Sequence, residues 1–129
     1  MNQPRWISAR VIHAVHEELL ARFGGLSGVR DQAMLESALD RPKNSFHYSE
    51  PTIYSMASDY AVGIVKNHPF VDGNKRTGFM AAYIFLMANG KKFQASEEST
   101  VLQTLALAAG EIDGTPYAAW LEASCEAPE

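Results

Sequence analysis

The sequence predicts an all-α fold, a compact bundle of about six helices in a single domain spanning residues 1–129. Apolar residues recur in successive segments at the spacing of amphipathic helices. Glycine and proline fall between these segments and mark their ends. No segment shows the strict alternation of a half-buried strand, so we expect at most one small hairpin. A chain of 129 residues suits one hydrophobic core.

The first two helices are defined by caps and breakers. The first is expected from about Ser8, its N-cap, to Phe23, and Gly24-Gly25 ends it. Its inward residues would be Ile12, Val15, Leu19 and Phe23. A second, shorter helix is expected from Asp31 to Asp40, with Pro42 ending it.

Between Arg41 and Pro51 the helical pattern is lost, which favours an irregular loop or a short hairpin. A third helix is expected to start near Pro51-Thr52 and to end at His68, because Pro69 pushes the preceding residue out of helical geometry. Its inward stripe would consist of Ile53, Ala57, Tyr60 and Ile64.

The fourth helix, from about Asn74 to Asn89-Gly90, is apolar on nearly every side, so we expect it to be central and buried. Ser96 or Ser99 opens a fifth helix, and Thr115-Pro116 opens a short last one around Trp120. The inward residues of the fifth helix would be Val101, Leu102, Leu105 and Ala109.

Composition excludes several classes of protein. The single cysteine, Cys125, allows no disulfide within the chain and favours a reducing compartment. The N-terminus lacks the apolar core of a signal peptide, and the longest apolar run, Phe79 to Ala88, is too short to span a bilayer. Residues 1–92 hold all eleven Lys and Arg against eight acids, and the rest hold seven acids. Acids thus outnumber Lys and Arg over the whole chain, and the resulting net charge of −4 argues against nucleic-acid binding. We expect a cytoplasmic protein without membrane contact.

The stretch HPFVDGNKRTG, His68 to Gly78, interrupts the most hydrophobic part of the chain. Gly73 and Asn74, directly before a helix, place unpaired N–H groups at the positive end of its dipole, which makes an anion site. Lys75 and Arg76 add positive charge there, and the planar guanidinium can hold two phosphate oxygens.

Two further residues complete the chemistry of a phosphate-transfer site. Asp72 suits a phosphate only if a divalent cation such as Mg²⁺ lies between them. His68 supplies a group that can accept a proton near neutral pH. Taken singly, the histidine could be a packed core residue, the Gly-Asn pair a helix cap and the Lys-Arg pair ordinary solvated cations. All of these residues occur within nine positions, which favours a functional site. Phe70 is expected to anchor the loop to the core.

Zinc is a weaker hypothesis. His13, His16 and Glu17 share one side of the first helix, but two histidines without a third convincing ligand do not make a zinc site.

His68 to Arg76 resembles the signature of the Fic/Doc family, HPFx(D/E)GNxR. Gly24-Gly25-Leu26, with Val29-Arg30-Asp31 and Leu35 to Leu39, resembles the N-terminal part of its short death-on-curing toxins. Ala108 to Ile112 resembles their C-terminal part. The resemblance covers nearly the whole chain. It implies a compact helical fold in which the motif links two central helices beside a flap, for which Arg41 to Pro51 is the candidate.

The resemblance also implies roles for the motif residues. His68 would take the proton from a target hydroxyl, Asp72 would bind Mg²⁺, and Gly73, Asn74 and Arg76 would bind the phosphates of ATP. Family members that transfer AMP typically have glycine where this chain has Lys75. In Doc-type toxins a lysine there accompanies a reversed ATP, so that the γ-phosphate passes to a threonine of elongation factor Tu and translation stops.

Two residues keep the alternative of AMP transfer open. Gly73 stands where the Doc type commonly has alanine, and Pro69 is more typical of Fic proteins. A third alternative is an inactive phosphate-binding module, against which the intact His68, Asp72 and Arg76 speak.

The resemblance further predicts how the activity is controlled. The family's inhibitory pattern, (S/T)xxxE(G/N), is absent from the sequence. A toxin of a toxin-antitoxin module would then need a separate antitoxin of Phd type, whose disordered tail folds onto an apolar groove.

Overall fold

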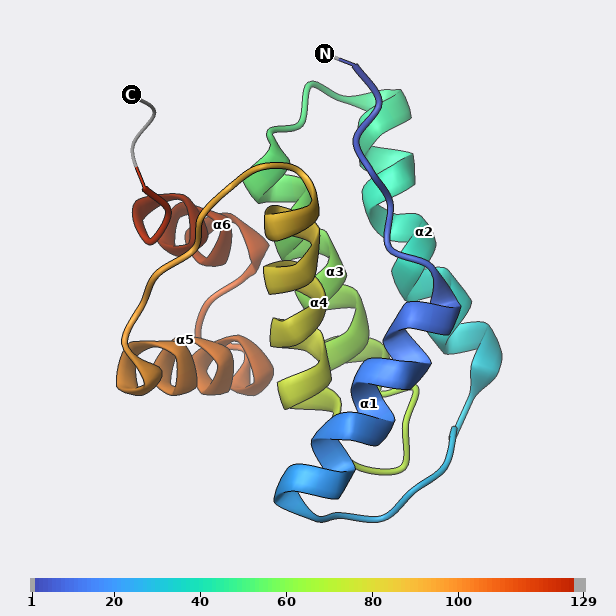
Figure 1. The fold of residues 1–129 in the computed structure, drawn as a ribbon. Coiled ribbons are helices and arrows are strands. Elements are labelled where there is room, and N and C mark those ends of the chain that lie inside the picture. Colours follow the sequence, from blue (N-terminus) through green and yellow to red (C-terminus); the bar gives the residue numbers. More distant parts are fainter. Residues whose placement is uncertain (1, 127–129) are drawn as a thin grey trace.

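The computed structural model describes residues 2–126, which form six helices and no named strand (Figure 1). The helices are α1 (Ala9–Phe23), α2 (Gln32–Tyr48), α3 (Ile53–Asn67), α4 (Asn74–Ala88), α5 (Glu97–Ala109) and α6 (Gly114–Ala123). The all-α prediction is confirmed. Side-chain caps from Ser8, Thr52 and Ser96 begin three helices where the sequence predicts them.

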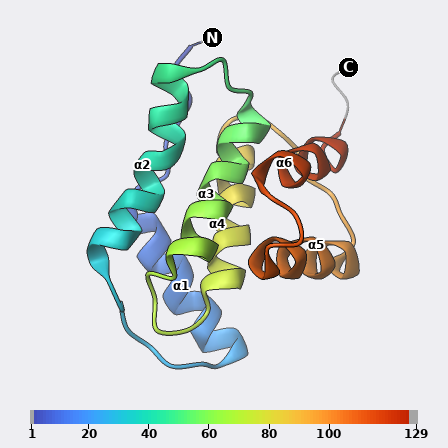
Figure 2. The same ribbon diagram turned by 180° about the vertical axis from the view of Figure 1, so that it is seen from behind.

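Helices α3 and α4 run antiparallel through the centre of the molecule (Figure 1). The α1–α2 pair lies on one side of them and the α5–α6 pair on the other, as the view from behind also shows (Figure 2). Gly78 lets the two central helices approach closely, because a Cβ there would lie 2.8 Å from Val65 Cγ2. The core between them contains fully buried side chains, among them Met56, Tyr60, Ile64, Phe85 and Leu86.

Helix α2 corrects the predicted end at Asp40. It continues through Pro42 to Tyr48, so most of the segment expected to form a loop or hairpin is helical, and only Ser49 to Pro51 remain as a connection to α3. Pro42 removes one backbone hydrogen bond, but its ring is buried on the same face as Leu35, Ala38 and Leu39. Burial of this stripe against α3 outweighs the local preference for a break.

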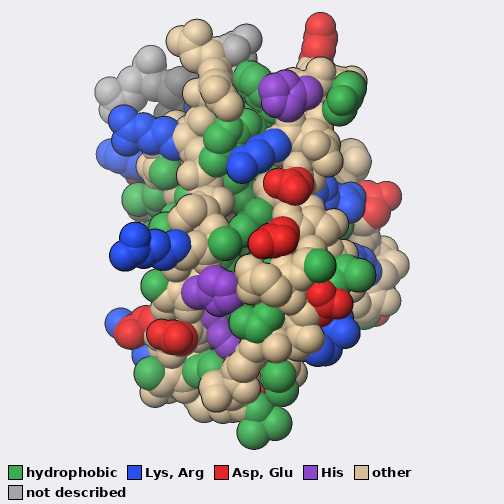
Figure 3. Space-filling model, turned by 90° about the vertical axis from the view of Figure 1, so that its right-hand side faces the viewer, with side chains coloured by type: hydrophobic (Ala, Val, Ile, Leu, Met, Phe, Trp, Pro, Cys, Tyr) green, Lys and Arg blue, Asp and Glu red, His purple; other side chains and the backbone are tan. Residues whose placement is uncertain are grey.

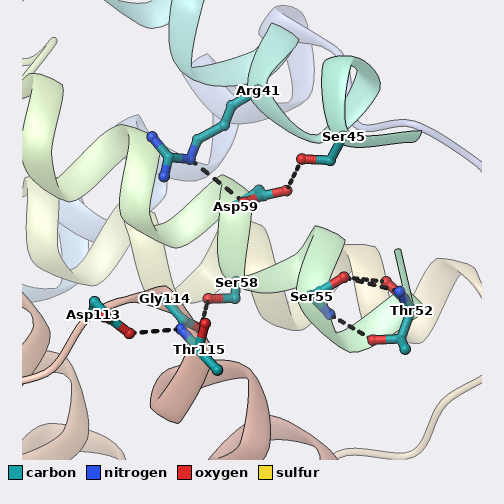
Figure 4. A network of polar contacts seen from close by, with 9 residues as sticks. All are labelled: Arg41, Ser45, Thr52, Ser55, Ser58, Asp59, Asp113, Gly114 and Thr115. Atoms are coloured by element: carbon teal, nitrogen blue, oxygen red, sulfur yellow. Dashed lines mark hydrogen bonds and ion pairs between the residues drawn. The ribbon is translucent and has the colours of Figure 1, made fainter. Parts of the chain in front are cut away.

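Polar contacts fix the end of α2 to α3 (Figure 4). The Ser45 hydroxyl donates to Asp59 Oδ2 at 2.7 Å, and Arg41 Nε donates to Asp59 Oδ1 at 3.4 Å. Burial raises the pKa of the Asp59 carboxyl above its ordinary value, while the bonds from Ser45 and Arg41 oppose that rise. The segment from Arg41 onward is therefore attached to the core and is not a free hairpin flap.

Two predictions of inward side chains were wrong. Val101, Leu102 and Leu105 of α5 are between 47% and 59% exposed, and Ala109 is exposed as well, whereas Thr104 and Leu107 are buried. Phe23, at the end of α1, is 58% exposed. A helix with apolar residues on two faces gives no unique inward direction from spacing alone.

The surface of the described residues carries mixed charge. Figure 3 shows acidic, basic and histidine side chains interspersed on the face that looks out from α1 and α2. Among the helices of residues 2–126, none has the length and apolar character needed to cross a membrane.

Candidate active site

The motif forms the loop between α3 and α4. His68 is the C-cap of α3 and has a left-handed backbone, with φ of 53°. It is the only residue other than glycine with positive φ in residues 2–126. Its side chain is exposed, whereas the next two residues, Pro69 and Phe70, are buried. The sharp backbone turn at His68 thus directs the imidazole out of the core while the loop turns inward.

Asn74 closes this loop from inside. Its side-chain oxygen accepts a hydrogen bond from Phe70 N–H at 3.0 Å, and its amide nitrogen donates to the Phe70 carbonyl at 2.9 Å. The side chain is only 4% exposed. The predicted phosphate binder therefore uses its side chain to shape the loop and leaves only its backbone N–H for an anion.

His16, which from the sequence is only a weak candidate for a zinc ligand, supports the loop from α1. Its ring stacks on the buried Phe70 ring with centroids 3.8 Å apart. Its Nε2 donates to the Asp72 carbonyl at 2.7 Å. No group of three or more potential metal-binding side chains occurs in the described part of the chain. His16 is thus a packing and hydrogen-bonding partner of the motif, and Phe70 is the anchor that the sequence predicts.

The Asp72 carboxylate is exposed and points toward the α1–α2 connection. Its oxygens accept hydrogen bonds from Leu26 N–H at 3.2 Å and Gly73 N–H at 2.9 Å. These two bonds hold the pKa of Asp72 below its ordinary value of 3.8, and the bond from Leu26 has the larger effect. A carboxylate has about four lone-pair directions, so it keeps sites for a cation. An ionised carboxylate beside a phosphate cradle is a donor set that Mg²⁺ accepts.

The N-terminus of α4 differs from that of every other helix in residues 2–126. Side chains cap α1, α2, α3, α5 and α6, but α4 begins at Gly73 without a side-chain cap. Gly73 has φ of 80°, which favours glycine. The N–H groups of the first turn, which carries Lys75 and Arg76, are therefore open to an anion at the positive end of the dipole.

A cleft of about 530 Å³ connects these groups with α5. Its size falls within the usual range for sites that bind small molecules. Lys75 also borders a second hollow of about 390 Å³ along α5. The guanidinium of Arg76 lies 4.5 Å above the ring of Phe23. The motif side of the cleft contains His68, Asp72, Gly73, Asn74, Lys75 and Arg76, and the α5 side contains Thr100, Val101, Thr104, Leu105 and Ala108.

Comparison with known proteins identifies the family of this chain. Residues 6–86 match the family model described as "Fic/DOC family". The chain belongs to the Fic/Doc family. It is 35% identical to "Protein kinase doc" of Escherichia phage P1 over 109 residues, which are 84% of this chain and 86% of that protein. It is 37% identical to "Toxin Doc" of Mycolicibacterium smegmatis over 75 residues, which are 57% of this chain and 58% of that protein.

The cleft and the residues that hold the Fic/Doc motif in place come from four parts of the chain: the motif itself, α1, the α1–α2 connection and α5. The motif residues predicted from the sequence all line one cleft. The Fic/Doc flap predicted at Arg41 to Pro51 contributes no residue to that cleft, and α5 forms the opposite wall. The contributions of His16 and Leu26 were missed, because only the fold brings α1 and the α1–α2 connection to the motif.

Proposed function

We propose that this Fic/Doc protein is the toxin of a toxin-antitoxin module and transfers the γ-phosphate of ATP to a Ser or Thr hydroxyl of a translation factor. The observation that carries the proposal is Lys75, the residue at the variable position of the motif, which lies in the cleft at the start of α4. The names of the relatives, "Protein kinase doc" and "Toxin Doc", support it.

In this reaction the target oxygen bonds to the γ-phosphorus, and the bond from that phosphorus to the bridging oxygen of ADP breaks. His68, exposed at the edge of the cleft, takes the hydroxyl proton. The N–H groups at the start of α4, with Lys75 and Arg76, hold the phosphates. Asp72 would hold Mg²⁺, which would neutralise phosphate charge.

AMP transfer to a hydroxyl is the second candidate. Gly73, in place of the alanine common in Doc-type proteins, favours it, as does Pro69, which is more typical of Fic proteins. In that reaction the target oxygen would attack the α-phosphorus and pyrophosphate would leave. Lys75, which occupies space at the boundary of the two hollows, argues for the first candidate.

We further propose elongation factor Tu as the target and a Phd-like antitoxin as the controlling partner. The outer face of α5 supports the second proposal, because Val101, Leu102 and Leu105 are half exposed and border the hollows beside Lys75. An antitoxin helix with an apolar face could cover them. We further propose that this activity takes place in the cytoplasm, where ATP and translation factors are found.

The deciding experiment incubates the purified protein with translation factors and ATP labelled at either the γ- or the α-phosphate. Label on elongation factor Tu from γ-labelled ATP alone supports the kinase. Label from α-labelled ATP would overturn it in favour of AMP transfer. No transfer from either, with the target present and ATP bound, would favour the phosphate-binding module.

A further inference from the structure

The α1–α2 connection, residues 24–31, lies at the same end of the molecule as the motif loop (Figures 1 and 2). We call these residues the strap. The strap runs antiparallel to the motif, with Val29 bridged to Phe70. Backbone hydrogen bonds continue the pairing on both sides: Val71 N–H donates to the Gly28 carbonyl at 3.0 Å, and Arg30 N–H donates to the Pro69 carbonyl at 2.7 Å.

Within the strap, Arg30 holds the backbone at the end of α3. Its Nε donates to the His68 carbonyl at 2.6 Å, and one terminal nitrogen donates to the Asn67 carbonyl at 2.8 Å. The last carbonyls of a helix lack partners within it, and a cation there also interacts favourably with the helix dipole. The planar fork of arginine reaches both carbonyls at once, which a lysine cannot do in the same way.

The imidazole of His68 has no hydrogen bond of its own to any residue from 2 to 126. Its direction therefore depends on its backbone, which is held at φ of 53° against the ordinary preference of a residue with a Cβ. Arg30 bonds to the carbonyl of this strained residue and to the carbonyl before it. The carbonyl after it, on Pro69, accepts from the backbone N–H groups of Arg30 and Asp31.

We propose that Arg30 is a positioning residue that sets the direction of the His68 side chain. The inference rests on the proposed function, in which His68 accepts the proton of the target hydroxyl. Arg30 does not line the cleft, so it acts through the backbone of His68 and not on the nucleotide. Loss of its two hydrogen bonds should misdirect the base while leaving the phosphate cradle of α4 intact.

The test uses the variants Arg30→Met and Arg30→Lys, with Arg22→Met as the control. Arg22 is also exposed and pairs through its Nε with Glu18, but it lies on α1 away from the His68 backbone. Three quantities are measured on each folded protein: kcat for transfer from ATP, the dissociation constant for ATP, and the imidazole NMR signals of His68. His68→Ala identifies those signals among the four histidines.

We expect Arg30→Met to lower kcat by about 10- to 100-fold, because an angstrom of misplacement can cost that much, with ATP affinity within about threefold of the parent. The His68 signals should shift or broaden. Arg30→Lys should recover part of kcat, and Arg22→Met should match the parent. A parental kcat in folded Arg30→Met would overturn the proposal, as would a loss of kcat with unchanged His68 signals.

The NMR measurement also separates the two proposals. If the parent transfers neither phosphate nor AMP, the proposed function fails, and the His68 signals alone then decide the role of Arg30. Unchanged signals in both Arg30 variants would overturn that role, whereas displaced signals would support it. If Arg30→Met does not fold, Arg30→Lys, which keeps the charge at the end of α3, gives the same two readings.

Discussion

The side-chain amide of Asn74 pairs with both backbone polar groups of Phe70, at 3.0 Å and 2.9 Å. Asn74, the first residue of α4, thereby connects the first helical turn to the loop that precedes the helix and fixes the conformation of that loop. Phe70 is itself held by the stacked ring of His16. The loop between His68 and Gly73 is therefore shaped from inside the core, and its outer groups are left for a ligand.

Replacing Asn74 by alanine should destabilise the protein and lower transfer activity. The change leaves the N–H and the carbonyl of Phe70 without partners in a buried place, and each such group costs about 1–3 kcal/mol. Urea denaturation measures the loss. Asn44→Ala, at an exposed position of α2, is the control and should change the free energy of unfolding by less than about 0.5 kcal/mol. Equal losses in the two variants would contradict the role assigned to Asn74.

Replacing His68 by alanine should abolish transfer and growth arrest and leave the fold intact. The imidazole is exposed and its loss creates no cavity. Because alanine fits poorly at φ of 53°, His68→Asn is the better matched variant, since asparagine tolerates that conformation. Circular dichroism checks folding, and labelled ATP checks transfer. Growth arrest by either folded variant would show that His68 is not the base.

Replacing Lys75 by glycine should move the product from phosphate toward AMP. The side chain lies between the cleft and the neighbouring hollow, so its removal opens space beside the phosphates. Parallel reactions with γ- and α-labelled ATP measure the ratio of the two products. Lys75→Met keeps most of the volume without the charge and separates the two effects. An unchanged product in the glycine variant would mean that Lys75 does not set the orientation of ATP.

Local signals in the sequence predicted the helices and the motif side of the cleft. The caps at Ser8, Thr52 and Ser96 act within a few residues of their own position, so they can be recognised without the fold. The motif is also contiguous. His16 and Arg30 could not be placed in this way, because the contacts they make are with residues 56 and 37 to 38 positions later in the chain. Only the packing of α1 and the strap beside the motif supplies those contacts.

Pro42 lies inside α2, although proline ordinarily ends a helix, because the packing of α2 against α3 outweighs this local preference. Gly63 of α3 lies at that contact and offers a test of it. Helix α3 approaches α2 so closely that a Cβ on Gly63 would lie 2.9 Å from the Cβ of Ala38 and 3.1 Å from its carbonyl oxygen. That carbonyl is four residues before Pro42, which has no N–H to offer it. Burial of side chains between α2 and α3 at this contact keeps α2 helical on both sides of Pro42.

Gly63→Ala should therefore destabilise the protein by about 1–3 kcal/mol, although alanine is the better helix former. Thermal and urea denaturation measure the change. Ala119→Gly, on an exposed position of α6, is a comparison for helix propensity alone and should cost about 1 kcal/mol. A Gly63→Ala protein more stable than the parent would show that α2 and α3 can separate without cost.

Two of the five tyrosines should make the protein sensitive to alkali. Tyr60 and Tyr117 are fully buried, and burial raises the pKa of each from 10.0 to about 12. Tyr60 accepts a hydrogen bond from Ile7 N–H at 3.0 Å. Since their folded pKa values are raised, the stability contributed by the neutral phenols is complete below pH 10 and is lost as pH rises toward 12.

Each tyrosine should cost about 1.4 kcal/mol of unfolding free energy per pH unit in that window. Urea denaturation at stepped pH values measures the decline, and ultraviolet difference absorbance follows ionisation. Tyr60→Phe should flatten the decline, whereas Tyr48→Phe, at a side chain that is 88% exposed, should not. Ionisation of Tyr60 and Tyr117 near pH 10 in the folded protein would contradict their burial in solution.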